Sequence, residues 1–397
     1  MNGTGRVPPA AATTGTILVV DDNEMNRDML SRRLGRDGHV VTVAEHGRAA
    51  LDRLAKEPFD LVLLDIMMPE LTGYEVLEIL KADVALRDIP VVMITATTEE
   101  DSIVRCLSLG AEDHLPKPFN PAILRARVGS SLAKKRLRDT ERLYARSLER
   151  ELEIGREIQM GFLPATLPAP AGWEIRAHFR PARQVAGDFY DAFTLADGRV
   201  ALVLADVCGK GVGAALFMAL FRSLLRALSE PQFAAAATPS AGLRATVLAT
   251  NDYIARTHDA ANMFATVFFA VVDPVSGALD YVNAGHEPPV LLAADGRVRG
   301  RLAPTGPAVG LMPDLEFNVG RAQLASGETL FAFTDGVVDA RDPHDASFGE
   351  SRLLALLSER AAPAHELLAR VDAALSGHIG DGAQFDDVAM LAARRGA

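Results

Sequence analysis

The fold of the first third of this chain is decided by the stretch Leu61-Val62-Leu63-Leu64-Asp65-Ile66-Met67-Met68-Pro69. Its four consecutive apolar residues leave no polar face for solvent, which is typical of a strand in a parallel sheet buried on both sides. Similar strands are predicted at residues 17–20, 39–43, 90–94 and 114–115. Periodic apolar residues between them predict helices at 26–36, 47–56, 72–82 and 101–109. This alternation predicts an α/β doubly wound domain with a five-stranded parallel sheet.

Polar side chains follow these predicted strands at their carboxyl ends. Asp21 and Asp22 follow the first strand, Asp65 the third and Thr95 the fourth, and Lys117 comes after the fifth. In a doubly wound sheet these ends open on one edge, where ligands bind. We expect the three carboxylates to hold one Mg²⁺. The remaining oxygen of Asp65 can then attack phosphorus, because the metal and Lys117 neutralise the incoming charge.

The motifs Asp-Asp, Asp-x-x-x-Pro, Thr-Ala and Lys-Pro, in this order, resemble the response-regulator receiver domain over residues 16–130. The resemblance implies that Asp65 accepts a phosphoryl group, that the Asp-Asp pair helps to bind Mg²⁺, and that Thr95 and Lys117 sense the phosphoryl group. His114, three residues before Lys117, matches the family's switch position. The implied phosphodonor is a sensor histidine kinase or a phosphotransfer protein.

The second half of the chain mixes strands and helices differently. Strands are predicted at residues 173–179, 189–194, 200–206, 264–273, 278–283, 289–292 and 328–334. Helices are predicted at residues 213–228, 239–256, 352–357 and 364–375. Hairpin-like strand pairs with a few long helices predict an α+β domain, a β-sandwich flanked by helices. On the first helix we expect Leu216, Phe217, Met218 and Leu220 to be core residues.

Four acidic positions in this second half lie beside short apolar runs, where strands give way to turns. They are Asp188, Asp206, Asp335 and Asp386, and Asp387 is a close alternative to Asp386 because the sequence cannot say which carboxylate points inward. Carboxylates gathered at strand ends are ligands for Mg²⁺ or Mn²⁺. Two such ions can activate a water and hold a phosphoryl group.

These segments resemble the PPM-type metal-dependent protein phosphatases, most closely the bacterial sporulation stage II E branch, from about residue 148 to the end. Supporting segments are 158–164, 181–188 and 283–286. The resemblance implies that Asp206 bridges two Mn²⁺ or Mg²⁺ ions and that the Val207 carbonyl completes one site with Asp188. The aspartates at 335 and 386, or 387, would hold the other ion.

The same resemblance implies hydrolysis of a phosphoserine or phosphothreonine protein by metal-activated water, with an anti-sigma-factor antagonist as the expected substrate. Arg183, five residues before Asp188, is placed to orient the phosphate or is an ordinary surface arginine. Cys208 is expected to be a packed residue, because no Cys-x₅-Arg loop of a tyrosine phosphatase surrounds it. His286 is either a general acid or a structural histidine.

A charged segment from about 120 to 162 joins the two parts. It carries an apolar stripe at the mostly helical spacing of Leu137, Tyr144, Leu148, Leu152, Ile158 and Phe162. The stripe predicts a long helix that pairs as a dimeric coiled coil or docks on its own domain. The predicted organisation is a disordered tail at 1–15, a receiver domain at 16–130, a helical coiled-coil-like linker at 131–171 and a phosphatase domain at 172–397. The expected oligomer is a homodimer.

Bulk properties exclude several classes of function. The net charge of −11 argues against nucleic-acid and acidic-membrane partners, and no basic helix-turn-helix segment follows the receiver as in DNA-binding regulators. Two cysteines in 397 residues indicate a reducing, cytoplasmic location without disulfides. We therefore predict a response regulator with a metal-dependent phosphatase output controlled at Asp65. The alternative is a catalytically weak output domain that sequesters a partner protein.

Overall fold

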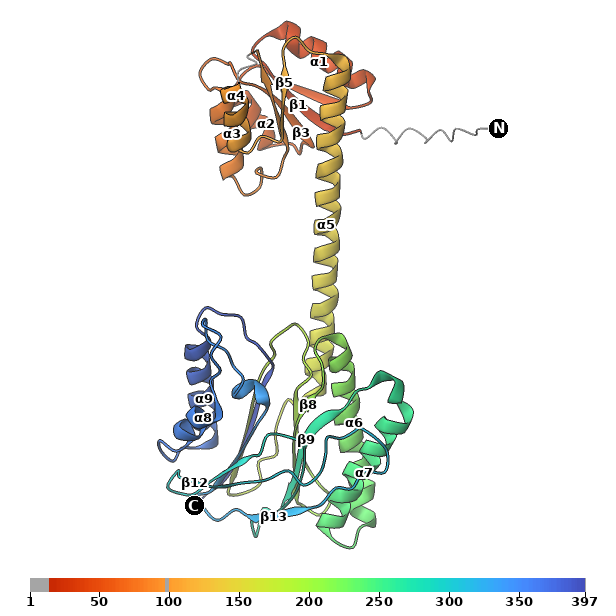
Figure 1. Cartoon of the computed structure of the whole chain (residues 1–397), viewed down its shortest axis with the longest axis vertical. Coiled ribbons are helices and arrows are strands. Elements are labelled where there is room, and N and C mark those ends of the chain that lie inside the picture. The colour runs from red at the N-terminus through yellow and green to blue at the C-terminus, as the bar shows by residue number, and fades with distance from the viewer. Residues whose placement is uncertain (1–13, 97–99, 397) are drawn as a thin grey trace, which may run out of the picture. The chain divides into compact units, whose positions relative to one another are not determined.

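The structure is a computed structural model that describes residues 14–96 and 100–396 (Figure 1). The chain forms two compact units, one up to Leu148 and the other from Glu149 onward. The predicted tail at residues 1–15 lies, apart from its last two residues, outside the described residues.

The first unit contains one parallel five-stranded sheet in the order β2-β1-β3-β4-β5. Its strands are β1 Thr16–Val20, β2 Val40–Ala44, β3 Leu61–Asp65, β4 Val91–Thr95 and β5 Asp113–Pro116. Its helices are α1 Glu24–Arg36, α2 Gly47–Leu54, α3 Gly73–Ala82 and α4 Glu100–Ser108. Strands β3 and β4 are buried throughout, with a separate apolar cluster on each face of the sheet. The predicted doubly wound fold is confirmed.

Helix α5, Pro121–Phe162, is a single helix of 42 residues. Its first turns place Leu124, Val128 and Leu132 in the core beneath the sheet of the first unit. Farther along, its predicted stripe is largely exposed: Tyr144 retains 75% and Leu148 58% of its accessible surface. The single long helix predicted for this segment is confirmed.

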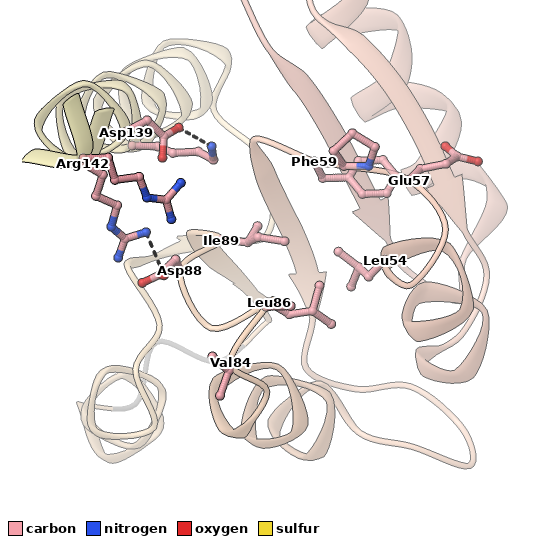
Figure 2. A pocket seen from close by; sticks show the side chains of 13 residues that line it. Leu54, Glu57, Phe59, Val84, Leu86, Asp88, Ile89, Asp139 and Arg142 are labelled. Atoms are coloured by element: carbon pink, nitrogen blue, oxygen red, sulfur yellow. Dashed lines mark hydrogen bonds and ion pairs between the residues drawn. The ribbon is translucent and has the colours of Figure 1, made fainter. Parts of the chain in front are cut away.

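Where α5 passes the loops of the first unit, a hollow opens between the helix and the sheet. Leu54, Phe59 and Ile89 line its apolar side (Figure 2). At its rim Arg142 of α5 makes a 2.8 Å ion pair with Asp88 in the loop between α3 and β4. Helix α5 is therefore tied to the loop between α3 and β4 beyond the part of the helix that packs on the sheet.

The second unit is built on two five-stranded sheets, β13-β10-β9-β8-β7 and β12-β11-β14-β15-β6. The first sheet contains β7 Phe189–Thr194, β8 Val200–Val207, β9 Ala265–Val272, β10 Ala278–Ala284 and β13 Gly320–Gln323. The second contains β6 Trp173–Arg180, β11 Val290–Leu292, β12 Val298–Arg301, β14 Thr329–Phe333 and β15 Val388–Arg395. Neighbouring strands in both sheets are antiparallel.

Helices cover the outer face of each sheet, so the second unit has four layers (Figure 1). They are α6 Val212–Ala235 and α7 Pro239–Thr257 on the first sheet, and α8 Glu350–Leu357 and α9 Ala364–Ile379 on the second. Short 3-10 turns lie at Asp259–Ala261 (η1) and Asp335–Val337 (η2). A third apolar cluster fills the space between the sheets. This arrangement confirms the predicted sandwich flanked by helices.

Several details of the second unit differ from the prediction. Strands β12, β13 and β15 were not predicted, and α6 continues through Pro231 to Ala235 instead of ending at residue 228. Leu216 is 67% exposed, so the expectation that it is a core residue is wrong, whereas Met218 is fully buried. Met218 follows Leu216 by two positions, which is a rotation of about 200° in an α-helix, so the two side chains point to nearly opposite faces and only one face is buried. Helix α6 is also long and apolar enough to cross a membrane, but it packs its buried face on the first sheet.

Candidate functional site

Acidic side chains gather at the carboxyl edge of the parallel sheet. Asp21, Asp22 and Asp65 each offer one oxygen, and these oxygens lie within 4.8 Å of one another. Asp21 and Asp65 are buried, whereas Asp22 is exposed. The Nζ atom of Lys117 lies 2.9 Å from Oδ2 of Asp21 and 2.9 Å from Oδ2 of Asp65. The structure thus brings together the four residues at which the sequence predicts metal binding and phosphoryl transfer.

The electrostatics of this edge match its geometry. Burial raises the pKa of Asp65, the hydrogen bond from Lys117 lowers it, and the charge of Asp21 raises it again. Burial lowers the pKa of Lys117, but the hydrogen bonds that its ammonium group donates to Asp65 and Asp21 outweigh this effect, so the pKa of Lys117 is raised. The single positive charge of Lys117 does not balance the three carboxylates at this edge. A divalent cation bound there would offset the remaining negative charge.

The two predicted switch residues lie on neighbouring strands. Thr95 is buried at the end of β4, and the backbone N–H of Lys117 donates to its carbonyl at 2.7 Å. His114 of β5 pairs in register with Met93 of β4 and is half-buried. Both residues therefore lie on the β4–β5 side of the acidic edge.

In the second unit, acidic residues from both sheets meet at the same end of the sandwich. Asp188 immediately precedes β7, and Asp206 is the penultimate residue of β8. Because Phe189 pairs with Ala205, the antiparallel register places these two aspartates opposite each other. Asp335 begins the 3-10 turn after β14, and Asp386 and Asp387 directly precede β15, the strand that pairs with β14. Strands far apart in sequence thus deliver all five predicted carboxylates to one place.

Mutual repulsion and burial raise the pKa values in this cluster. The pKa of Asp206 is raised to about 6, chiefly by burial and then by the charge of Asp335. Burial and the charge of Asp206 raise the pKa of Asp188 well above its ordinary value. The pKa values of Asp335 and Asp387 are also raised, again mainly by burial. A group of carboxylates whose ionisation is opposed by burial and by mutual repulsion is stabilised by cations.

The structure distinguishes Asp386 from Asp387 by their partners. Both oxygens of Asp387 accept backbone N–H groups, from Ala182 at 2.7 Å and from Gly187 at 2.8 Å. Asp386 instead receives the Nζ atom of Lys210 at 2.7 Å through Oδ2. Asp387 therefore fixes the loop that leads to Asp188, whereas Asp386 makes a contact that a metal ion can replace.

Two further observations show that this cluster fits divalent cations. Oδ2 of Asp188 is buried, and no hydrogen-bond donor among the described residues reaches it. The Val207 carbonyl lies so near Gly187 that a Cβ atom built at Gly187 would sit 2.8 Å from its oxygen. The missing side chain thus keeps this carbonyl close to the Asp188 loop. An orphaned carboxylate oxygen and an adjacent carbonyl are hard ligands of the kind that Mg²⁺ and Mn²⁺ bind.

The remaining predicted residues surround the cluster. Arg183 is exposed in the loop before Asp188. The Cys208 Sγ atom accepts the Phe264 backbone N–H at 3.3 Å and contacts Met263, as a packed residue does. His286 is 3% exposed, its Nδ1 lies 3.0 Å from the Thr266 hydroxyl, and burial lowers its pKa to about 3. A neutral, enclosed imidazole favours the structural role over the general acid.

Two residues that join this site to its surroundings received no role from the sequence. Gln159 near the end of α5 is buried and makes two hydrogen bonds to the backbone of Ala186. Its Nε2 donates to the Ala186 carbonyl at 2.6 Å, and its Oε1 accepts the Ala186 N–H at 3.0 Å. Lys210 bridges the loop after β8 to the residues before β15. The sequence did contain a signal for Gln159, because it is a polar amide among apolar residues near the end of the predicted helix. The sequence offered no comparable signal for Lys210.

Comparison with known proteins agrees with both halves of this description. Residues 17–129 match the family model of the response regulator receiver domain. "Protein IcfG" of Synechocystis sp. is 45% identical over 263 residues, which are 62% of this chain and 41% of that protein. "Probable transcriptional regulator ycf27" of Guillardia theta is 39% identical over 120 residues, covering 30% of this chain and 46% of that protein. The chain thus spans less than half the length of these two relatives.

A solved structure shares the fold of the second unit. The "SiaA-PP2C domain of Pseudomonas aeruginosa" superimposes with a TM-score of 0.53 and 24% sequence identity, covering 63% of this chain and 98% of that one. Residues 196–396, half of the chain, match the family model named "Stage II sporulation protein E (SpoIIE)". This stretch contains Asp206, Asp335 and Asp386. The chain therefore belongs to the SpoIIE family and joins a receiver domain to a SpoIIE-type, phosphatase-like domain.

Proposed function

We propose that this protein is a metal-dependent phosphoserine/phosphothreonine protein phosphatase whose activity is controlled by phosphorylation of Asp65. The observation that carries the proposal is the meeting of Asp188, Asp206, Asp335 and Asp386 at one end of the sandwich, with an orphaned buried oxygen on Asp188. A carboxylate cluster that repels itself is costly to fold, and divalent cations offset that cost.

The proposed roles follow from the positions of these groups. Asp206 would be shared by two ions, Asp188 and the Val207 carbonyl would help to hold one of them, and Asp335 and Asp386 would help to hold the other. Two bound Mn²⁺ or Mg²⁺ ions would supply an acidic water and neutralise charge on the phosphoryl group. Asp387, with both oxygens bonded to the backbone, positions the loop that carries Asp188.

Arg183 is proposed to orient the substrate phosphate, because its exposed guanidinium lies in the loop that leads to Asp188. A guanidinium presents two parallel N–H donors to phosphate oxygens. His286 has no proton-transfer role in this proposal, since its imidazole is neutral and enclosed.

The decisive experiment compares the wild type with Asp206→Asn on a phosphoserine protein, with and without Mn²⁺. We expect Mn²⁺ to stimulate phosphate release by the wild type and the substitution to lower that rate by more than about 100-fold, since it removes a shared ligand. Circular dichroism checks that the variant is folded. Near-wild-type turnover by Asp206→Asn would refute the two-metal assignment. A wild type that binds phosphoproteins without hydrolysing them would favour a sequestering module.

Control and partners complete the proposal. In the receiver, Asp21, Asp22 and Asp65 would hold one Mg²⁺, Lys117 and Thr95 would sense the phosphoryl group, and His114 would act as the switch residue. The proposed phosphodonor is a sensor histidine kinase or phosphotransfer protein, and the proposed substrate is an anti-sigma-factor antagonist. The proposed assembly is a cytoplasmic homodimer paired through the stripe on α5.

A further inference from the structure

Phe385 is an exposed aromatic residue directly beside the proposed metal site. It immediately precedes Asp386 and retains 48% of its accessible surface. As the residue before Asp386 it lies next to the carboxylate cluster, because adjacent Cα atoms are about 3.8 Å apart. A ring in this place meets whatever surrounds the substrate phosphate.

Two cations from different segments lie against this ring. The Lys210 Nζ atom, from the loop after β8, is 4.7 Å from the ring centroid. The Arg341 guanidinium, after the 3-10 turn η2, is 4.9 Å from it. Cations bind to the negative face of an aromatic ring and leave its positive edge for anions. Lys210, Arg341 and Phe385 thus form a compact cluster, here called the cationic rim, next to a strongly acidic site, and each cation also pairs with one carboxylate, Asp386 or Asp345.

Both cations keep hydrogen-bonding capacity for a ligand. Lys210 uses Nζ for Asp386 Oδ2 at 2.7 Å and the Phe385 carbonyl at 3.1 Å, and an ammonium group has a third donor. Arg341 uses one terminal nitrogen, Nη1, for Asp345. Its Nε is buried and out of reach of an outside ligand, so the second terminal nitrogen, Nη2, for which the described residues provide no hydrogen-bond acceptor, is the donor that remains. The Asp345 side chain is 84% exposed, so a carboxylate from outside can exchange with this weak pair.

We propose that the cationic rim recognises acidic residues flanking the phosphorylated serine or threonine of the protein substrate. This inference rests on the proposed phosphatase function and adds the substrate class to it. An extended peptide advances about 3.3–3.6 Å per residue, so acidic side chains within about three positions of the phosphoserine reach the rim. The carboxylate cluster repels such residues everywhere else around the site, and the rim gives them one favourable side.

The experiment uses two synthetic phosphoserine peptides that differ only in flanking residues, glutamate in one and lysine in the other. The full chain is assayed with Mn²⁺, and kcat/KM is measured for both peptides and for a small aryl phosphate. We expect the wild type to favour the acidic peptide by about tenfold, as charge-assisted contacts at a half-exposed surface would give. Arg341→Glu should abolish or reverse this preference.

The matched control is Arg244→Glu, the same charge change at an exposed arginine of α7, which should keep the preference.

Fluorescence anisotropy with the metal-free protein provides a second measurement, in which Arg341→Glu and Phe385→Ala should weaken binding of the labelled acidic peptide. Equal turnover and equal binding of the two peptides by the wild type would overturn the cationic rim. So would an unchanged preference in Arg341→Glu. Failure to hydrolyse any of the three substrates would instead refute the proposed function, and anisotropy would still decide the rim.

Discussion

Asp386 and Asp387 are neighbours with identical side chains and different partners. The sequence predicted that one of them binds metal but could not choose, because successive residues of an extended segment point to opposite sides and either phase was possible. The backbone N–H groups of Ala182 and Gly187, about 200 residues earlier in the chain, donate to both oxygens of Asp387, which favours Asp386 as the proposed metal ligand. Contacts of this kind depend on folded loops and leave no local pattern in the sequence.

The repulsion at Asp206 gives a prediction about stability. Its pKa in the folded protein is about 6, above the ordinary value of 3.8, so the folded state binds this proton more tightly than the unfolded state does. Stability is therefore lost as pH rises from about 4 to about 6, and the whole penalty remains above that range. In metal-free protein, Asp206→Asn should raise stability at pH 7.5 by roughly 1–3 kcal/mol and by less at pH 5. Thermal melting of both proteins in chelator at the two pH values measures the difference, and an equal gain at both would contradict this origin.

Asp65 gives a second prediction at this scale. Its buried carboxylate lies 2.9 Å from Lys117 Nζ and beside two further carboxylates, the arrangement proposed for phosphoryl transfer. A small phosphodonor with Mg²⁺ should add one phosphoryl group to the wild type and none to Asp65→Ala. Intact-mass spectrometry gives the count. Equal incorporation into both proteins would mean that another residue is the acceptor.

Among the elements, the receiver strands were predicted within one or two residues, whereas β15 was missed. Strand β3 reads as Leu-Val-Leu-Leu-Asp, but β15 reads as Val-Ala-Met-Leu-Ala-Ala-Arg-Arg and is rich in residues that are rare in strands. Pairing on both sides with β14 and β6 keeps it extended. Tertiary contacts likewise outweigh local preference in α6. This helix continues past Pro231 because one of its faces packs on the first sheet.

The end of α5 gives a prediction at the level of elements. Gln159→Leu removes both hydrogen bonds to Ala186 and leaves a buried N–H and C=O without partners, at about 1–3 kcal/mol each. The loop before Asp188 should loosen, so the melting temperature and phosphatase activity should both fall. Differential scanning fluorimetry and phosphate release measure the two effects.

The control places the same new side chain on the exposed face of the same helix. Glu157→Leu breaks no buried hydrogen bond and should leave the melting temperature and activity close to wild type. If Gln159→Leu behaves like this control, the two hydrogen bonds between Gln159 and Ala186 do not help to hold the proposed metal site.

For the whole molecule, the question is how phosphorylation of Asp65 would influence the proposed phosphatase site. A long helix transmits a signal only if it has two arrangements of different stability. Pairing of α5 with a second copy is the proposed change, because Leu148 of the apolar stripe is exposed and Leu152, on the same stripe, is half-buried. Each leucine buried in such a pair adds roughly 1.5–3 kcal/mol.

Leu148→Glu combined with Leu152→Glu should therefore weaken self-association and remove the response to phosphodonor, while a basal phosphatase rate persists. Light scattering measures the mass, and phosphate release is followed on the same samples. A double variant that stays dimeric, or one that becomes monomeric and still responds normally, rules this coupling out.

The continuity of α5 has one more consequence. In this helix of 42 residues, each residue rotates the chain by about 100° around the helix axis. A change in the number of residues therefore changes the rotation between the two ends of the helix. Removing two residues from its exposed middle rotates everything that follows by about 200°, whereas removing seven leaves it within about 20° of its original direction. Natural variants of this architecture should therefore tolerate insertions and deletions in α5 more readily in whole heptads than in other lengths.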